Sequence, residues 1–163
     1  MSELRGLIEA ACPSATLEEI EHAGELTIEV DPDRLVDVCT FLKNASGGFA
    51  MLSDVTCADF LDGGGGSPTG YRFRLAYQLF SVETGERVRL RVWASADDPE
   101  VDSVTGVWAT ANWLEREVWD MFGVRFRNHP DLSRILMPFD WEGHPLRRDY
   151  PLGGEEVQFS DAV

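Results

Sequence analysis

The chain has 163 residues, 44% of them hydrophobic, and a formal net charge of −15 at pH 7. This size and composition are typical of one domain with a core of its own. Nucleic acids and anionic lipids are bound through basic surfaces, so the acidity argues against both as partners. The sequence has no apolar run near the roughly 18 residues that span a bilayer, and its N-terminus has no signal pattern. We therefore expect a cytosolic protein, or one on the cytosolic side of an assembly, without direct membrane insertion.

The chain contains three cysteines, Cys12, Cys39 and Cys57, and none of them forms a CxxC pair. An odd number of widely spaced cysteines argues against a disulfide framework. Iron–sulfur clusters usually require four thiolates, so this chain alone lacks the usual ligand set. We expect the three side chains to be small buried apolar groups.

The first 60 residues predict alternating helices and strands. Ser2 is placed to cap a helix that Pro13 ends, and Asp31-Pro32 is a typical start for the next helix. Apolar residues repeat at helical or strand spacing in four segments, which predict helix, strand, helix and strand in that order: residues 4–11, 26–30, 35–42 and 50–60.

A glycine-rich segment, residues 63–70, follows these elements. Phosphate-binding loops of the P-loop type need a Lys-Ser/Thr pair and a helix directly behind them. This segment contains no lysine, and a strand pattern follows it. We interpret it as a connector between strands.

The clearest strands are residues 71–79 and 88–94, which alternate apolar and polar side chains on either side of a turn at Glu83–Glu86. If they pair as a hairpin, arginines gather on one face of the sheet: Arg72, Arg74, Arg87, Arg89 and Arg91. One interpretation is a solvated face neutralised by the protein's own acids. The other is a docking face for an acidic neighbour.

A long helix is expected next, capped by Asp102 or Ser103 and ended by Gly123 in a left-handed conformation. Its apolar side chains are spaced three and four apart: Val104, Val107, Ala111, Leu114, Val118 and Met121. With the earlier elements, this helix predicts a two-layer α+β domain, with a mainly antiparallel or mixed sheet packed by helices.

Glu115 and Glu117 in this helix do not form a catalytic pair, because residues two apart are rotated by about 200° around a helix. Arg116 lies one turn before Asp120 and is expected to form a weak surface ion pair with it. Glu115 shares its face with Trp108, Asn112 and Trp119. That face is either a recognition surface or part of the core.

His129 and His144 are the two histidines near other polar groups, and a metal site with a nearby aspartate is conceivable. They lack the close spacing of known metal motifs, so we favour a turn at His129-Pro130 whose imidazole caps a neighbour. No nucleophile elbow, Cys-His neighbourhood or dinucleotide motif is present. A metal-dependent enzyme that uses both histidines stays as an alternative, which elemental analysis tests.

From residue 124 onward the chain has no helical or strand period, although it is rich in apolar side chains and contains Pro130, Pro138, Pro145 and Pro151. We predict a domain over residues 1–123 and a C-terminal arm over residues 124–163. Because such an arm has little with which to pack, we expect it to be buried against another protein. Residues 128–163 are expected to be mobile without that partner.

Three motifs resemble the signature of one family. They are Glu115-Arg116-Glu117 with Trp119 to Gly123, then His129-Pro130 with Leu132 and Arg134 to Leu136, and finally Pro145 to Leu152. In order and spacing they are similar to the 30 kDa subunit family of respiratory complex I. Ser133 stands where relatives more often have a basic residue, and Arg148 replaces the usual lysine.

This resemblance implies a non-catalytic structural subunit in the hydrophilic arm of proton-translocating NADH:quinone oxidoreductase, on the cytoplasmic face of the bacterial inner membrane. The arm is expected to wrap the hydrogenase-like subunit that forms the quinone site, near the iron–sulfur subunits. FMN, the clusters and quinone then belong to other chains, and none binds here. Apolar contacts are expected from Leu136, Phe139, Trp141 and Tyr150. The residues expected to contact partners through polar groups are Glu115, Arg116, Glu117, Asp120, His129, Arg134, Arg147, Arg148 and Asp149.

A related machine is the alternative, because similar domains occur in membrane-bound nickel–iron hydrogenase and formate hydrogenlyase complexes. Neighbouring genes discriminate between the two. A gene for an NADH-binding flavoprotein favours complex I, and a gene for a nickel-ligating large subunit favours the hydrogenase type.

Overall fold

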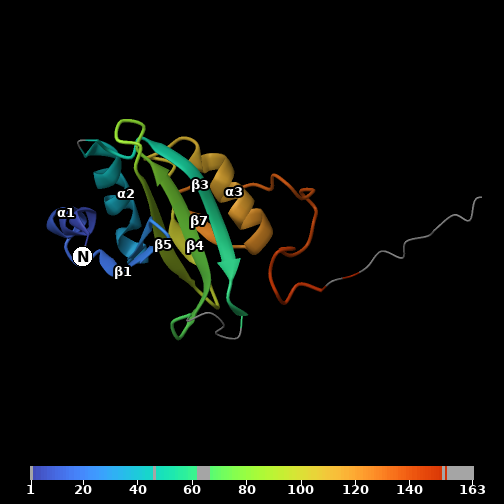
Figure 1. Cartoon of the computed structure of the whole chain (residues 1–163). Coiled ribbons are helices and arrows are strands. Elements are labelled where there is room, and N and C mark those ends of the chain that lie inside the picture. Colours follow the sequence, from blue (N-terminus) through green and yellow to red (C-terminus); the bar gives the residue numbers. More distant parts are fainter. Residues whose placement is uncertain (1, 46, 62–66, 152, 154–163) are drawn as a thin grey trace, which may run out of the picture.

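The computed structural model describes residues 2–45, 47–61, 67–151 and 153. Figure 1 shows the chain as a sheet flanked by helices, with a C-terminal segment that runs on past the last helix. The elements in chain order are α1 (Glu3–Ala11), β1 (Thr16–His22), β2 (Glu25–Val30), a 3-10 turn (Pro32–Arg34), α2 (Leu35–Asn44), β3 (Met51–Asp59), β4 (Tyr71–Phe80), β5 (Arg87–Ser95), β6 (Glu100–Asp102), α3 (Ala111–Phe122) and β7 (Arg125–Arg127).

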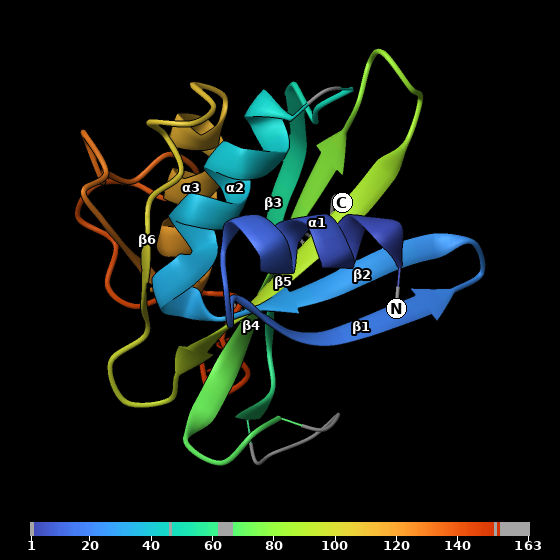
Figure 2. The ribbon, with the colours of Figure 1, turned by 90° about the vertical axis from the view of Figure 1, so that its left-hand side faces the viewer.

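Five strands form one mixed sheet in the order β1-β2-β5-β4-β3. All neighbours are antiparallel except β2 and β5, which are parallel. Helices α2 and α3 lie on the same side of the sheet in Figure 2, and their buried residues join those of the strands in one core. The predicted α+β class is therefore confirmed. In the described part of the chain, no helix is long and apolar enough to cross a membrane.

The predicted local signals explain most of these elements. Ser2 accepts a hydrogen bond from the Arg5 amide and caps α1, while Asp31 caps the turn that leads into α2. Strands β4 and β5 pair as the expected hairpin, and their apolar side chains alternate into the core. The three cysteines are free and buried, as predicted. Residues 62–66 of the glycine-rich connector lie outside the described residues.

The predicted start of the third helix is wrong by about two turns. The helix begins at Ala111, and the buried Val104, Val107 and Trp108 lie in successive tight turns before it. The cause is Glu115, whose carboxylate accepts a hydrogen bond from the Val104 amide at 2.8 Å and so fixes that backbone outside the helix. Gly123 ends the helix at φ +74°, as expected.

The arginine face of the sheet is largely neutralised within the chain. Arg89 pairs with Glu25, and Arg91 lies within reach of Glu18 and Glu29. The other three arginines also have neighbours: Arg72 binds Asp59, Arg74 stacks on the rings of Phe60 and Trp93, and Arg87 stacks on Phe80. These contacts favour the first of the two interpretations, a face neutralised by the protein's own acids.

Tyr77 offers a direct test of the core. Its side chain is fully buried, and its hydroxyl has no hydrogen-bond partner among the described residues. An unsatisfied buried hydroxyl is unfavourable, so Tyr77→Phe should raise the free energy of unfolding by about 1 kcal/mol in chemical denaturation. Tyr71→Phe, at an exposed position of the same strand, should leave it unchanged. A loss of stability in Tyr77→Phe would show that the hydroxyl is bonded in solution.

Candidate protein-binding site

The chain keeps packing into the domain beyond Gly123. Strand β7 pairs in parallel with β6, and both Val124 and Phe126 belong to the core. Residues 128–151, which follow β7, then run back over the C-terminal end of α3. We call them the docked arm. The contacts below show that this described part of the predicted arm packs on its own domain, which its sequence pattern did not indicate, whereas burial of the arm against a partner stays a prediction. Residues 152 and 154–163 of the predicted arm lie outside the described residues.

The docked arm completes the C-terminal end of α3. The last carbonyl groups of a helix lack partners within the helix and must find them elsewhere. The His144 ring donates from Nδ1 to the Asp120 carbonyl at 3.0 Å, and the Leu146 amide donates to the Met121 carbonyl at 3.0 Å. The Arg147 side chain donates to the carbonyl of Phe122. The arm therefore acts as the cap of this helix, with a cation at its negative end.

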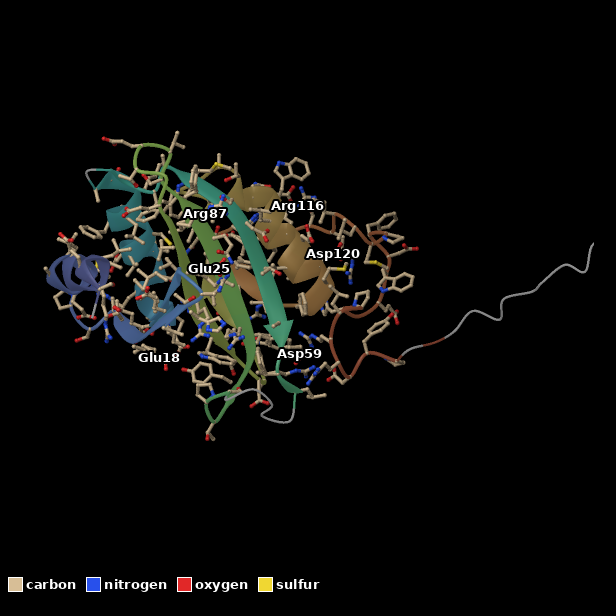
Figure 3. All side chains as sticks on the ribbon, in the orientation of Figure 1. Glu18, Glu25, Asp59, Arg87, Arg116 and Asp120 are labelled. Atoms are coloured by element: carbon tan, nitrogen blue, oxygen red, sulfur yellow. The ribbon has the colours of Figure 1, made fainter. Side chains whose placement is uncertain are left out.

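Asp120 holds the arm's backbone from the same helix (Figure 3). Its side chain is fully buried, and one carboxylate oxygen accepts hydrogen bonds of 2.8 to 3.0 Å from the amides of Ile135, Leu136 and Met137. The other oxygen accepts from the Arg134 guanidinium. Burial by itself would raise the pKa of Asp120, but these donors outweigh it and hold the pKa below its usual range.

Two arginines extend this network. Arg116 donates to the carbonyls of Ser133 and Arg134 at 3.0 and 3.1 Å, so its predicted ion pair with Asp120 does not form. Arg134 takes that place, and it also donates to the carbonyls of Trp141 and Gly143. A guanidinium has five N–H donors in a fixed plane, which suits it to joining several backbone groups.

The end of the docked arm is fastened to the sheet by Arg72 of β4. The Arg72 guanidinium donates to both carboxylate oxygens of Asp59 and to both of Asp149, at distances of 2.6 to 2.9 Å. Asp59 also accepts from the Arg148 amide at 2.8 Å. Burial opposes the charge of Asp59, yet Arg72 and the amides keep the pKa of this carboxyl lowered. Figure 3 shows Asp59 at the end of β3, beside the last part of the arm.

The first residues of the docked arm lie next to a buried carboxylate, that of Glu115. Glu115 is fully buried and accepts from the Ser103 hydroxyl at 2.6 Å as well as from the Val104 amide. His129 Nε2 lies 3.9 Å from this carboxylate and donates to the Asn112 carbonyl at 3.1 Å. The Asp131 amide donates to His129 Nδ1, which is the predicted turn at His129-Pro130. Burial raises the pKa of Glu115 to about 7.

The polar residues predicted to contact partners therefore divide into two groups. Glu115, Asp120, His129, Arg134 and Arg147 are engaged within the chain, as are Arg116 and Asp149. The side chains of Glu117 and Arg148 are exposed, and neither forms an ion pair among the described residues. Of the tryptophans expected on the recognition face, Trp108 is buried in the core. Trp119 is half-buried against the His144 ring.

Apolar side chains of the docked arm point away from these polar contacts. Phe139 is 93% exposed, Leu136 59%, Leu146 55% and Trp141 40%, and Trp113 of α3 is 61% exposed. Tyr150, also expected to make apolar contacts with a partner, instead lies over Gly143. Exposed large apolar groups on a fixed backbone are typical of a protein-binding surface. We call Trp113, Leu136, Phe139, Trp141 and Leu146 the apolar surface.

His129 and His144 belong to different parts of this arrangement, since each donates to a different carbonyl of α3. In the described ranges, no group of three His, Cys, Asp or Glu residues is placed to hold a metal ion. Burial lowers the pKa of His144, which favours a neutral ring beside Arg147. Sequence reasoning missed Asp59 and assigned Arg72 only to the sheet face, because neither lies in a motif that links it to the arm.

A family model described as the respiratory-chain NADH dehydrogenase 30 kDa subunit matches residues 28–156. The chain is 46% identical over 143 residues to the corresponding NADH-quinone oxidoreductase subunit from Geobacter sulfurreducens, which covers 88% of this chain and 85% of that protein. It is also 46% identical over 154 residues to the corresponding subunit from Roseiflexus sp. (strain RS-1), with 94% and 85% covered.

Solved structures give the same fold. The trypsin-resistant fragment (1-134) of Nqo5 superposes with a TM-score of 0.63 at 29% identity, over 80% of this chain and all of that fragment. One component of the membrane-bound sulfane sulfur reductase, an archaeal respiratory membrane complex, gives 0.74 over 92% of this chain and 85% of that one. At 22% identity, the second match shows the fold alone.

Proposed function

Because this chain belongs to the family of the respiratory-chain NADH dehydrogenase 30 kDa subunit, we propose that it is a structural subunit of an NADH:quinone oxidoreductase. In this role it has no active site and binds no cofactor. It docks to the hydrogenase-like, quinone-site subunit, close to the iron–sulfur subunits. The assembled enzyme passes electrons from NADH through FMN and the clusters to quinone and translocates protons. The chain lies at the cytoplasmic face of the bacterial inner membrane.

One observation carries the proposal: the docked arm holds its backbone with its own domain and leaves its large apolar side chains free. Asp120, Arg134 and Arg72 fix the path of the arm. Phe139, the most exposed of the apolar surface, has little contact with the rest of the chain. A surface prepared in this way loses little conformational entropy on binding, which favours a stable interface between subunits.

The fold also occurs in the sulfane sulfur reductase complex, and that likeness keeps a related respiratory machine, such as a membrane-bound hydrogenase-type complex, as the second candidate. The two relatives at 46% identity are both named as subunits of NADH-quinone oxidoreductase and favour the first. Co-purifying chains discriminate the two. An NADH-binding flavoprotein supports complex I, and a nickel-binding large subunit supports the alternative.

A double variant, Phe139→Ser with Trp141→Ser, tests docking through the apolar surface. Both side chains are exposed, so the chain should fold as before. Large aromatic anchors often contribute about 2 kcal/mol or more to an interface. With an affinity tag on the quinone-site subunit, we expect roughly tenfold less of the chain to be recovered from detergent-solubilised membranes.

Val82→Ser is the matched control, because Val82 is 69% exposed in the turn between β4 and β5, away from the arm. It should be recovered in the same amount as the unmodified chain. Equal recovery of the double variant and this control would contradict docking through the apolar surface.

A further inference from the structure

Glu115 and His129 form a buried titratable pair that the proposed docking does not use. Both side chains are 0% exposed, and the His129 Nε2 atom lies 3.9 Å from the Glu115 carboxylate. Glu115 belongs to α3, whereas His129 is the second residue of the docked arm, which follows β7. The pair therefore joins the helix to the root of the arm, which we define as residues 128–133.

The Glu115 carboxylate is met by neutral donors. The Ser103 hydroxyl and the Val104 amide each donate one hydrogen bond to it. Cys39 of α2 and Tyr77 of β4 are two titratable groups near enough to feel its charge, and both are buried and neutral. Among the described residues, no lysine or arginine forms an ion pair with it. An ionised Glu115 would thus be a buried charge without a compensating cation, which is unfavourable.

His129 could compensate such a charge only as a cation, and the cationic ring would lose a hydrogen bond within the arm. In the structure the neutral ring accepts from the Asp131 amide at Nδ1 and donates to the Asn112 carbonyl at Nε2. A proton added at Nδ1 removes the lone pair that the Asp131 amide needs. Ionisation of Glu115 therefore leaves either an uncompensated charge in the core or a broken turn at the root.

We propose that Glu115 and His129 form a pH-sensitive latch, in which the protonated carboxyl keeps the root closed against α3 and loss of its proton loosens the root. The carboxyl proton is released to water, and the charge left on Glu115 has no compensating cation while the root stays closed. The latch is a property of this chain and does not depend on the proposed docking to the quinone-site subunit.

The direction of the pH dependence follows from the burial of Glu115. Burial raises its pKa from 4.5 to about 7 in the folded chain. Because the folded value is the higher one, the latch's stabilisation is complete below about pH 4.5 and is lost as the pH rises through about 7. Exposed Glu117, two residues along the same helix, has no such environment and provides a matched control.

Hydrogen exchange of the full-length chain tests the latch. After correction for intrinsic exchange rates, we expect protection of the root to fall roughly tenfold or more between about pH 5 and pH 8. Glu115→Gln keeps a neutral side chain of the same shape, so its protection should be the same at both values. Glu117→Gln should behave as the unmodified chain. Root protection that does not change with pH, or a Glu115→Gln chain that keeps the full change, would overturn the latch.

A titration of the unmodified chain decides the matter should Glu115→Gln fail to fold. The carboxyl carbon of Glu115, followed by NMR, should titrate near neutral pH, well above the ordinary value of 4.5 for a glutamate. A Glu115 carboxyl that titrates near its ordinary value of 4.5 would overturn the proposal.

Discussion

Asp120→Asn should release the docked arm from the domain. The asparagine side chain has nearly the same shape, but it lacks the charge and presents an NH2 group, a donor, to groups that are themselves donors. Three backbone amides and the Arg134 guanidinium then compete for one carbonyl oxygen. Breaking a buried ion pair from one side costs about 3–5 kcal/mol, which is enough to undo the local docking.

Hydrogen exchange measures this release, because the amides of Ile135, Leu136 and Met137 donate directly to Asp120. Their protection should fall by a factor of roughly a hundred or more, while that of the β4–β5 hairpin stays high. Glu117→Gln removes a carboxylate from the exposed side of the same helix and should leave these amides protected. Unchanged protection of residues 135–137 in Asp120→Asn would contradict the role given to this carboxylate.

Asp120 and Glu115 respond to pH in opposite directions, although they lie on the same helix. The pKa of Asp120 is lowered, so its contribution is present above about 3.8, its ordinary value, and is lost as the pH falls through the lower folded value. The pKa of Glu115 is raised, so its contribution is lost as the pH rises. In mildly acidic solution the arm is therefore held both at its root, by Glu115, and at residues 135–137, by Asp120. Alkaline solution weakens the contact at the root first.

An element is predictable from the sequence when its pattern of apolar and polar residues indicates which side chains are buried. The alternation of β4 and β5 indicates their pairing and buried face, since successive side chains of a strand point to opposite faces. Strand β1 escapes prediction because it is an edge strand with exposed glutamates, so its pattern has little alternation. The predicted helix start is misplaced because Val104 and Val107 lie in buried turns at a spacing that a helix also gives.

The site is predictable only in part, because the hydrogen-bond partners of its charged residues are mostly backbone groups. Motif resemblance identifies Asp120, Arg134 and Arg147, but it assigns their charges to another protein. Their partners are mainly backbone amides and carbonyls of the same chain, which a sequence does not distinguish from one position to the next. The contact of Arg72 with Asp149 joins residues 77 apart in the sequence and depends on the completed sheet.

These contacts within the chain change how the motifs relate to the proposed binding. Most of the charged motif residues hold the docked arm on its own domain, and the proposed docking assigns partner contact to the exposed apolar residues. Losses of assembly after mutation of Asp120 or Arg134 are then expected to arise from a displaced arm, because the Asp120 side chain is buried and the Arg134 side chain is largely buried in contacts with the arm. Mutations in the apolar surface should weaken assembly while the arm keeps its protection in hydrogen exchange. The two classes of variant are therefore distinguishable in the isolated chain.

Gly123→Ala should be among the most destabilising single-methyl changes in this protein. Gly123 has φ +74°, a conformation that side chains with a Cβ adopt only with strain. A Cβ atom there would also lie 2.5 and 2.6 Å from atoms of the His144 ring and in contact with the Arg147 guanidinium. Those two side chains cap the last carbonyls of α3, so moving them breaks two further hydrogen bonds.

We expect Gly123→Ala to lower the free energy of unfolding by about 2–4 kcal/mol, combining backbone strain with two lost hydrogen bonds of about 1 kcal/mol each. Gly85→Ala separates these contributions, because Gly85 has φ +75° and a methyl group placed there would meet no atom within 4 Å. That control should lose only about 1 kcal/mol. Denaturant unfolding of both variants measures the difference, and hydrogen exchange of residues 144–147 should increase in Gly123→Ala alone. Equal losses of unfolding free energy in the two variants would mean that the arm moves aside for the methyl group without cost and that its capping of α3 contributes little to stability.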